Sequence, residues 1–168
     1  DLNYIIPKVV AEIGCNHMGR MDIAKELIDL AKQSGAGYVK FQKRNNKELL
    51  TEDQYNTPHL VPENSYGDTY GAHRESLEFD LKQNKELKEY CDSLDIVYST
   101  SVWDVSSAKD MITLNPDFLK VPSACNNNFK MLGVLRDEYE GQVQLSVGMT
   151  TRDEIEEIVN FFEETNQA

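Results

Sequence analysis

Short apolar runs alternate along the chain with longer segments whose apolar residues recur at helical spacing. The apolar runs predict strands over residues 8–13, 38–42, 96–101, 118–121 and 142–147. The segments between them predict helices over residues 21–34, 84–94, 104–113 and 129–138, with Asn84 as the N-cap of the second. Thr151 and Glu154 form a capping box ahead of a last helix. The pattern predicts a strand followed by a helix, five times over.

Strands and helices that alternate at this spacing predict an α/β fold with a parallel sheet, because a crossover of helical length returns the chain to the same edge. Two arrangements fit five such units. One is a section of a (β/α)8 barrel of the TIM-barrel type, which takes about 250 residues when complete. The other is a five-stranded doubly wound sheet, which would be complete in 168 residues. The apolar pattern does not distinguish the two.

Residues 44–79 interrupt this alternation with many polar residues and with Pro58, Pro62, Gly67 and Gly71. A connection of this length in a compact domain is either a functional loop or a solvated insertion. The segment is interspersed with aromatic residues, namely Tyr55, Tyr66, Tyr70 and Phe79. These favour an ordered loop over the edge of the sheet.

Hydrophobic residues make up 40% and charged residues 27% of the chain, a composition typical of one folded domain. The net charge of −12 argues against nucleic acid and anionic membrane as partners, because an acidic surface repels phosphate. The sequence has neither an apolar run of spanning length nor the features of a signal peptide. Cys15, Cys91 and Cys125 are odd in number and widely spaced, which predicts reduced thiols in a cytoplasmic protein.

Polar residues occur at the carboxyl end of every predicted strand, where parallel α/β folds bind their ligands. The most informative are two lysines, Lys40 and Lys120. A single lysine in a strand is as readily a surface residue as a ligand-binding one. Two buried ammonium groups at one sheet edge, however, require an anion to compensate their charge. A ligand carrying a phosphate and a carboxylate would do so. Hydroxyl donors that could complete the anion site lie at or just after the carboxyl ends of the later strands, at Thr100, Ser123 and Ser146.

The first two strands supply further candidates. Gln42 lies two residues after Lys40 and therefore faces the same pocket. Glu12 is either an acid or base or simply an ion-pair partner of Lys40. His17 is a loop histidine, a proton shuttle or a metal ligand. No set of His, Asp and Glu residues shows metal-ligand spacing, so the sequence supports no metal site in this chain.

Five motifs together resemble the N-acetylneuraminate (sialic acid) synthase family. They are AEIGCNHMG at residues 11–19, GAGYVKFQ at 35–42, YST at 98–100, KVPS at 120–123 and LSVGM at 145–149. The first motif is specific, and the others support it by their order and spacing. The family also includes relatives that make legionaminic and pseudaminic acids.

The resemblance implies a TIM barrel that condenses phosphoenolpyruvate with N-acetylmannosamine or its 6-phosphate and releases phosphate, aided by a divalent metal, manganese or magnesium. Under this resemblance Glu12 is the catalytic carboxylate and Gln42 lies beside it. The resemblance also implies that Asn64 contacts the acceptor sugar. The residues that it implies would hold phosphoenolpyruvate are Lys40, Thr100, Lys120, Ser123 and Ser146.

Pro122 and Val147 depart from the family pattern, in which glycine and a hydroxyl residue are common, although the two serines of the anion site are retained. The resemblance makes residues 1–168 the N-terminal portion of the barrel domain. The metal-binding histidines, the later strands and a C-terminal antifreeze-like domain would then lie beyond residue 168. The chain begins without methionine, as a segment of a longer protein would.

The leading interpretation is therefore part of a sialic acid synthase, inactive alone and a homodimer when complete. Two alternatives remain. One is a synthase of another nonulosonic acid, of the legionaminic or pseudaminic type. The other is a non-catalytic α/β module that binds a small anion.

Overall fold

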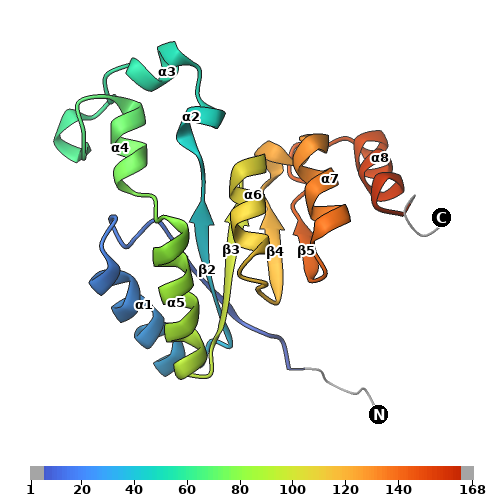
Figure 1. Ribbon diagram of the computed structural model, residues 1–168, viewed down its shortest axis with the longest axis horizontal. Helices are drawn as coiled ribbons and strands as arrows, with labels where there is room; N and C mark the ends of the chain where they lie inside the picture. Colours follow the sequence, from blue (N-terminus) through green and yellow to red (C-terminus); the bar gives the residue numbers. More distant parts are fainter. Residues whose placement is uncertain (1–5, 164–168) are drawn as a thin grey trace.

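The computed structural model describes residues 6–163 and contains one parallel sheet of five strands (Figure 1). The strands follow one another across the sheet in chain order, β1-β2-β3-β4-β5, and every neighbouring pair is parallel. Their bounds are Val10–Gly14, Tyr38–Lys43, Val97–Val102, Phe118–Val121 and Gln142–Leu145. All five predicted strands are confirmed, and the fifth ends two residues before the predicted limit.

The main helices each follow a strand and pack on the same side of the sheet. They are α1 (Met21–Gln33), α5 (Leu81–Ser93), α6 (Val105–Ile112), α7 (Phe129–Glu138) and α8 (Arg152–Glu163). Two core clusters fill the space between this side of the sheet and the helices. One joins β1, β2 and β3 to α1 and α5, and the other joins β3, β4 and β5 to α6, α7 and α8.

This arrangement decides between the two predicted folds. A doubly wound sheet reverses its strand order at a switch point and carries helices on both faces. Here the order never reverses and the helices cover one face, as in a section of a (β/α)8 barrel. The doubly wound alternative is therefore wrong. The uncovered face corresponds to the interior of such a barrel.

Residues 44–79 form an ordered insertion after β2 and before α5. It contains α2 (Asn46–Leu49), α3 (Glu52–Asn56), the 3-10 helix η1 (Pro62–Asn64) and α4 (Tyr70–Ser76). A capping box between Thr51 and Gln54 starts α3. The Tyr55 ring packs onto α4 at Gly71, where a β-carbon would overlap the ring. The ordered loop that the aromatic residues predicted is confirmed.

The predicted cap of the second main helix is wrong. Asp80, not Asn84, caps α5: its side chain accepts a hydrogen bond from the Gln83 amide, and Gln83 bonds back to the Asp80 amide. Asn84 lies inside the helix, fully buried, where its side chain donates to the carbonyl oxygens of Phe79 and Asp80. Among the described residues, no helix is both long and apolar enough to cross a membrane.

Candidate active site

The candidate site lies on the face of the sheet that the helices leave uncovered. Because strand residues alternate between faces, the residues next to core residues such as Ile13, Phe41 and Leu119 point to this open side. The strand register places Glu12 beside Lys40 and Lys40 beside Ser99, and it places Ser101 beside Lys120. Four neighbouring strands thus contribute a carboxylate, two ammonium groups, an amide and hydroxyls to one surface.

Glu12 and Lys40 form an ion pair at the centre of this surface. The Lys40 Nζ also donates to the Ser101 Oγ at 3.1 Å, and the Gln42 Nε2 donates to the Glu12 Oε1 at 3.0 Å. Lys40 is only 9% exposed, whereas half of the Glu12 side chain is open to solvent. The Glu12 carboxylate compensates the buried Lys40 ammonium group, and an anion that binds here would compete with Glu12 for Lys40.

Lys120 brings a second positive charge to the same place. Its pKa is lowered, first by burial and then by the nearby Lys40 ammonium group, while Glu12 partly offsets the effect. Two ammonium groups against one carboxylate leave a net positive charge on this surface, although the whole molecule is strongly acidic. A small anion that enters here would relieve the repulsion between the two lysines.

The loop after β1 gives Glu12 room to approach its partners. The pairing of β1 with β2 shifts register between Glu12 and Gly14, as at a β-bulge. Gly14 adopts a φ of 59°, and a β-carbon there would lie 3.4 Å from the Glu12 Oε1. Glycine therefore suits the left-handed backbone at this position, and a β-carbon would only touch the carboxylate.

The loops after β4 and β5 place two serines near the same end of the sheet. Ser123 begins the 3-10 helix η2 (Ser123–Cys125), and Gly148 approaches it so closely that a β-carbon on Gly148 would lie 3.5 Å from the Ser123 Oγ. The Ser146 amide donates to the Val121 carbonyl oxygen at 3.0 Å. Asn126, which the sequence did not single out, donates to the Ser146 carbonyl oxygen at 3.0 Å and to the Thr150 hydroxyl at 2.7 Å. It thereby connects the two loops.

Comparisons with known proteins agree with this geometry. Residues 27–168 match the model of the NeuB family. The chain belongs to the NeuB family. Over 94% of its length it is 33% identical to the N-acetylneuraminate-9-phosphate synthase of Homo sapiens, and over 90% it is 30% identical to the N,N'-diacetyllegionaminic acid synthase of Campylobacter jejuni. It covers 44% and 45% of those proteins, so it spans less than half the length of either relative.

A solved structure of the family has the same fold. The sialic acid synthetase of Leptospira borgpetersenii, in complex with citrate, superimposes with a TM-score of 0.78 at 26% identity. The match covers 99% of this chain and 55% of that one. The five units of this NeuB chain therefore form a section of the barrel-type fold.

The structure does not bring every predicted residue of the NeuB chain into the cluster. Thr100 is fully buried and pairs in register with Phe41 and Leu119, so it faces the helices. Ser101 occupies the position that contacts Lys40, because a one-residue step along a strand reverses the face. Asn64 lies exposed in η1, within the insertion rather than on the sheet face.

A second layer of side chains supports the cluster, and sequence reasoning missed it. The Trp103 Nε1 donates to the Gln42 Oε1 at 2.7 Å, and the Arg44 guanidinium lies 5.8 Å from the centre of the Trp103 ring. Arg44 pairs with Glu78 at 2.5 Å, and both side chains are largely buried. Burial raises the pKa of the Glu78 carboxyl, and Arg44 counteracts this. Arg44 also donates to the Cys15 Sγ at 2.9 Å.

His17 helps to hold the loop after β1 in place. Its Nδ1 accepts a hydrogen bond from the Gly19 amide at 3.1 Å, and its ring stacks on Phe79 with the centroids 4.1 Å apart. Burial lowers the His17 pKa to about 4, so the ring is neutral at physiological pH. Since the Nδ1 accepts, the proton resides on the Nε2. The contacts of this buried, neutral ring therefore tie the loop to Phe79.

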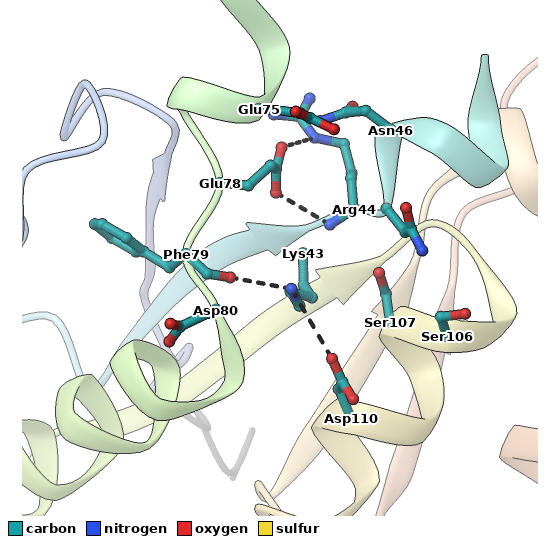
Figure 2. Close-up of a pocket in the computed structure, with 11 residues that line it drawn as sticks. Lys43, Arg44, Asn46, Glu75, Glu78, Phe79, Asp80, Ser106, Ser107 and Asp110 are labelled. Atoms are coloured by element: carbon teal, nitrogen blue, oxygen red, sulfur yellow. Dashed lines mark hydrogen bonds and ion pairs between the residues drawn. The ribbon is translucent and has the colours of Figure 1, made fainter. Parts of the chain in front are cut away.

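A separate pocket of about 270 Å³ lies on the helix-covered side of the sheet (Figure 2). Lys43, one residue after Gln42, points into it, donates to the Phe79 carbonyl oxygen at 3.0 Å and lies 4.0 Å from the Asp110 carboxylate. Asn46 also lines the pocket, and both polar atoms of its buried side chain lack a hydrogen-bond partner. Within residues 6–163, no group of three or more His, Cys, Asp or Glu side chains could hold a metal ion.

Proposed function

We propose that the protein containing this chain condenses phosphoenolpyruvate with an amino-sugar acceptor and releases phosphate. The acceptor proposed first is N-acetylmannosamine or its 6-phosphate, which gives N-acetylneuraminate or its phosphate. The observation that carries the proposal is the pair of lysines, Lys40 and Lys120, that face one open surface with the single carboxylate of Glu12. Phosphoenolpyruvate carries the phosphate and the carboxylate that such a surface would bind.

Each residue of the cluster has a role in this reaction. Lys40 and Lys120 would neutralise the phosphate and the carboxylate of phosphoenolpyruvate, and the hydroxyls of Ser123 and Ser146 would donate further hydrogen bonds. The third carbon of the enol forms a bond to the aldehyde carbon of the acceptor. Water then adds at the second carbon, and phosphate leaves. Glu12, half exposed beside the bound anion, is the proposed group for proton transfer.

A divalent metal, manganese or magnesium, would act as a Lewis acid on the acceptor aldehyde when bound. The described residues offer no ligand set for such an ion, and the roles proposed for this chain's residues do not depend on one. The chain spans less than half of the length of these two relatives. We therefore propose turnover for the complete protein only. We also propose that the complete protein is a homodimer in the cytoplasm. The chain alone is expected to bind phosphoenolpyruvate without turnover.

The acceptor is the part of the proposal with a real alternative. The human relative is named for N-acetylneuraminate 9-phosphate, and the Campylobacter relative for diacetyllegionaminic acid. We propose that the two products arise by the same condensation from different amino-sugar acceptors. Competition between N-acetylmannosamine, its 6-phosphate and a diacetylated acceptor, with phosphate release as the signal, would identify the acceptor of the complete protein.

Calorimetric titration of phosphoenolpyruvate into the chain tests the anion site directly. We expect Lys120→Met to weaken binding at least about tenfold, because it removes a charged hydrogen-bond donor from the site. Lys109→Met is the matched control, since Lys109 is exposed on α6 outside the cluster, and its affinity should stay within about twofold of the original. Equal affinities for the two variants would contradict the proposed phosphoenolpyruvate site.

A further inference from the structure

Trp103, the only tryptophan of the chain, lies beside the candidate active site. It follows the last residue of β3, is partly buried, and uses its single polar atom on the Gln42 side chain at 2.7 Å. The other end of the same amide donates to Glu12 at 3.0 Å. Trp103, Gln42 and Glu12 therefore form a continuous line of hydrogen bonds that ends on the proposed catalytic carboxylate.

The chemistry of the three groups fixes the direction of this line. An indole N–H can only donate a hydrogen bond, and an ionised carboxylate can only accept one. Gln42 satisfies both only when its oxygen faces Trp103 and its nitrogen faces Glu12. The flipped amide would set oxygen against carboxylate oxygen and N–H against N–H. Trp103 thus selects the orientation of Gln42 that supports Glu12.

The indole is itself held in place. The Arg44 guanidinium lies over its ring, and the largely buried pair with Glu78 immobilises Arg44 in turn. This support matters most when ligand is bound. An anion on Lys40 competes with the Lys40–Glu12 ion pair, and the bond from Gln42 then remains to orient the carboxylate.

We propose that Trp103 is a positioning residue, which acts through Gln42 to hold Glu12 in its reactive orientation. The inference rests on the proposed synthase function. It assigns Trp103 no contact with substrate. A residue that acts only through Gln42 should have no effect once the Gln42 amide is gone, and this gives the inference a sharp test.

The test is a double-mutant cycle in the complete protein with Trp103→Phe and Gln42→Leu. Phe keeps an aromatic ring beneath Arg44 but removes the N–H. We expect Trp103→Phe to lower kcat about tenfold, as loss of one charge-coupled hydrogen bond would, while the KM for phosphoenolpyruvate stays within about twofold. In the Gln42→Leu background, the same substitution should change kcat by less than about twofold. Fully additive effects, or a Trp103→Phe enzyme with unchanged kcat, would overturn the inference.

A second measurement separates this inference from the proposed function. A chain with one tryptophan gives one indole N–H signal in a proton–nitrogen NMR spectrum. Gln42→Leu should accelerate hydrogen exchange of that N–H at least about tenfold, because its acceptor is lost. Gln144→Leu, a change on the same sheet face but on β5, should leave exchange unchanged.

Unchanged exchange in Gln42→Leu would overturn the positioning geometry. If exchange accelerates but the complete protein condenses no amino sugar, the synthase proposal fails while the hydrogen-bonded line stands.

Discussion

Lys120 shows how a single partly buried charge can set the pH range of a binding site. Burial and the neighbouring Lys40 lower its pKa from the ordinary value of 10.5. The protonated form, which binds an anion, is therefore lost at a lower pH than for an exposed lysine. Since the phosphate of the ligand is fully ionised above about pH 7, its own titration does not mask this effect.

We therefore expect the affinity of the chain for phosphoenolpyruvate to decline as the pH rises from about 7 towards 10. Lys120→Arg should flatten the decline, because a guanidinium keeps its charge throughout this range. Calorimetry across the pH series, in buffers of equal ionic strength, measures both curves. Parallel curves for the two proteins would show that Lys120 does not control the pH dependence.

Two buried asparagines provide a contrast in polar burial. Asn46 is 2% exposed, and its side-chain nitrogen and oxygen both lack partners. Asn84 is equally buried, but its nitrogen donates to two carbonyl oxygens and its oxygen accepts from the Tyr98 hydroxyl at 2.7 Å. Burial of an unpaired amide is costly, whereas a paired amide cannot be removed without leaving its partners unsatisfied.

Asn46→Leu should therefore leave the free energy of unfolding unchanged or raise it by up to about 1 kcal/mol. Asn84→Leu should lower it by about 2–4 kcal/mol, because the hydroxyl and carbonyl groups around it lose their partner. Chemical denaturation measures both free energies of unfolding, with the same dependence on denaturant concentration applied to the two variants and the original chain. A marked loss of stability in Asn46→Leu would reveal a partner for that amide, such as an ordered water in the pocket of Figure 2.

At the scale of elements, the insertion depends on a close packing contact between α3 and α4. Gly71 admits the Tyr55 ring, and a methyl group there would overlap it. Gly71→Ala should therefore destabilise the chain by about 1–3 kcal/mol, despite the better helix propensity of alanine.

Gly133 in α7 is the control, because a β-carbon there would meet only the Phe161 ring at 3.7 Å. Gly133→Ala should be neutral or stabilise by up to about 1 kcal/mol. Thermal unfolding measures the midpoint temperature of each variant. A shift of both midpoints in the same direction would contradict this account.

The strands could be predicted from the sequence because each is a short apolar run, and the side chains that face the helices fill the core. Sequence reasoning named Thr100, not Ser101, for the anion site; which of the two lies beside Lys40 depends on the register between β2 and β3. It also missed the bond between Trp103 and Gln42, which are 61 residues apart and meet only when the strands pair. Glu12, Lys40 and Gln42 were predictable because adjacent strand ends converge.

At the scale of the whole molecule, the sheet has an open edge beside an apolar surface. Among the described strands, β5 pairs with β4 alone. Next to that edge lies an apolar groove of about 370 Å³ between β5 and α8, lined mainly by Val143, Leu145, Val147, Ile155, Ile158, Val159 and Phe162. An unpaired edge strand next to exposed apolar side chains favours association with another chain.

We expect the chain in solution to associate with a second copy of itself through this groove. Val159, which is 47% exposed there, can carry a charge without disturbing the core, so Val159→Lys should reduce association. Leu60→Lys is the matched control, because Leu60 is 94% exposed in the insertion, far along the chain from β5 and α8. Sedimentation at increasing concentration should give a rising average mass for the original chain and for Leu60→Lys, and a smaller rise for Val159→Lys. If both lysine variants behave alike, association does not use the β5–α8 groove; a monomer at all concentrations would mean that the open edge is tolerated as it stands.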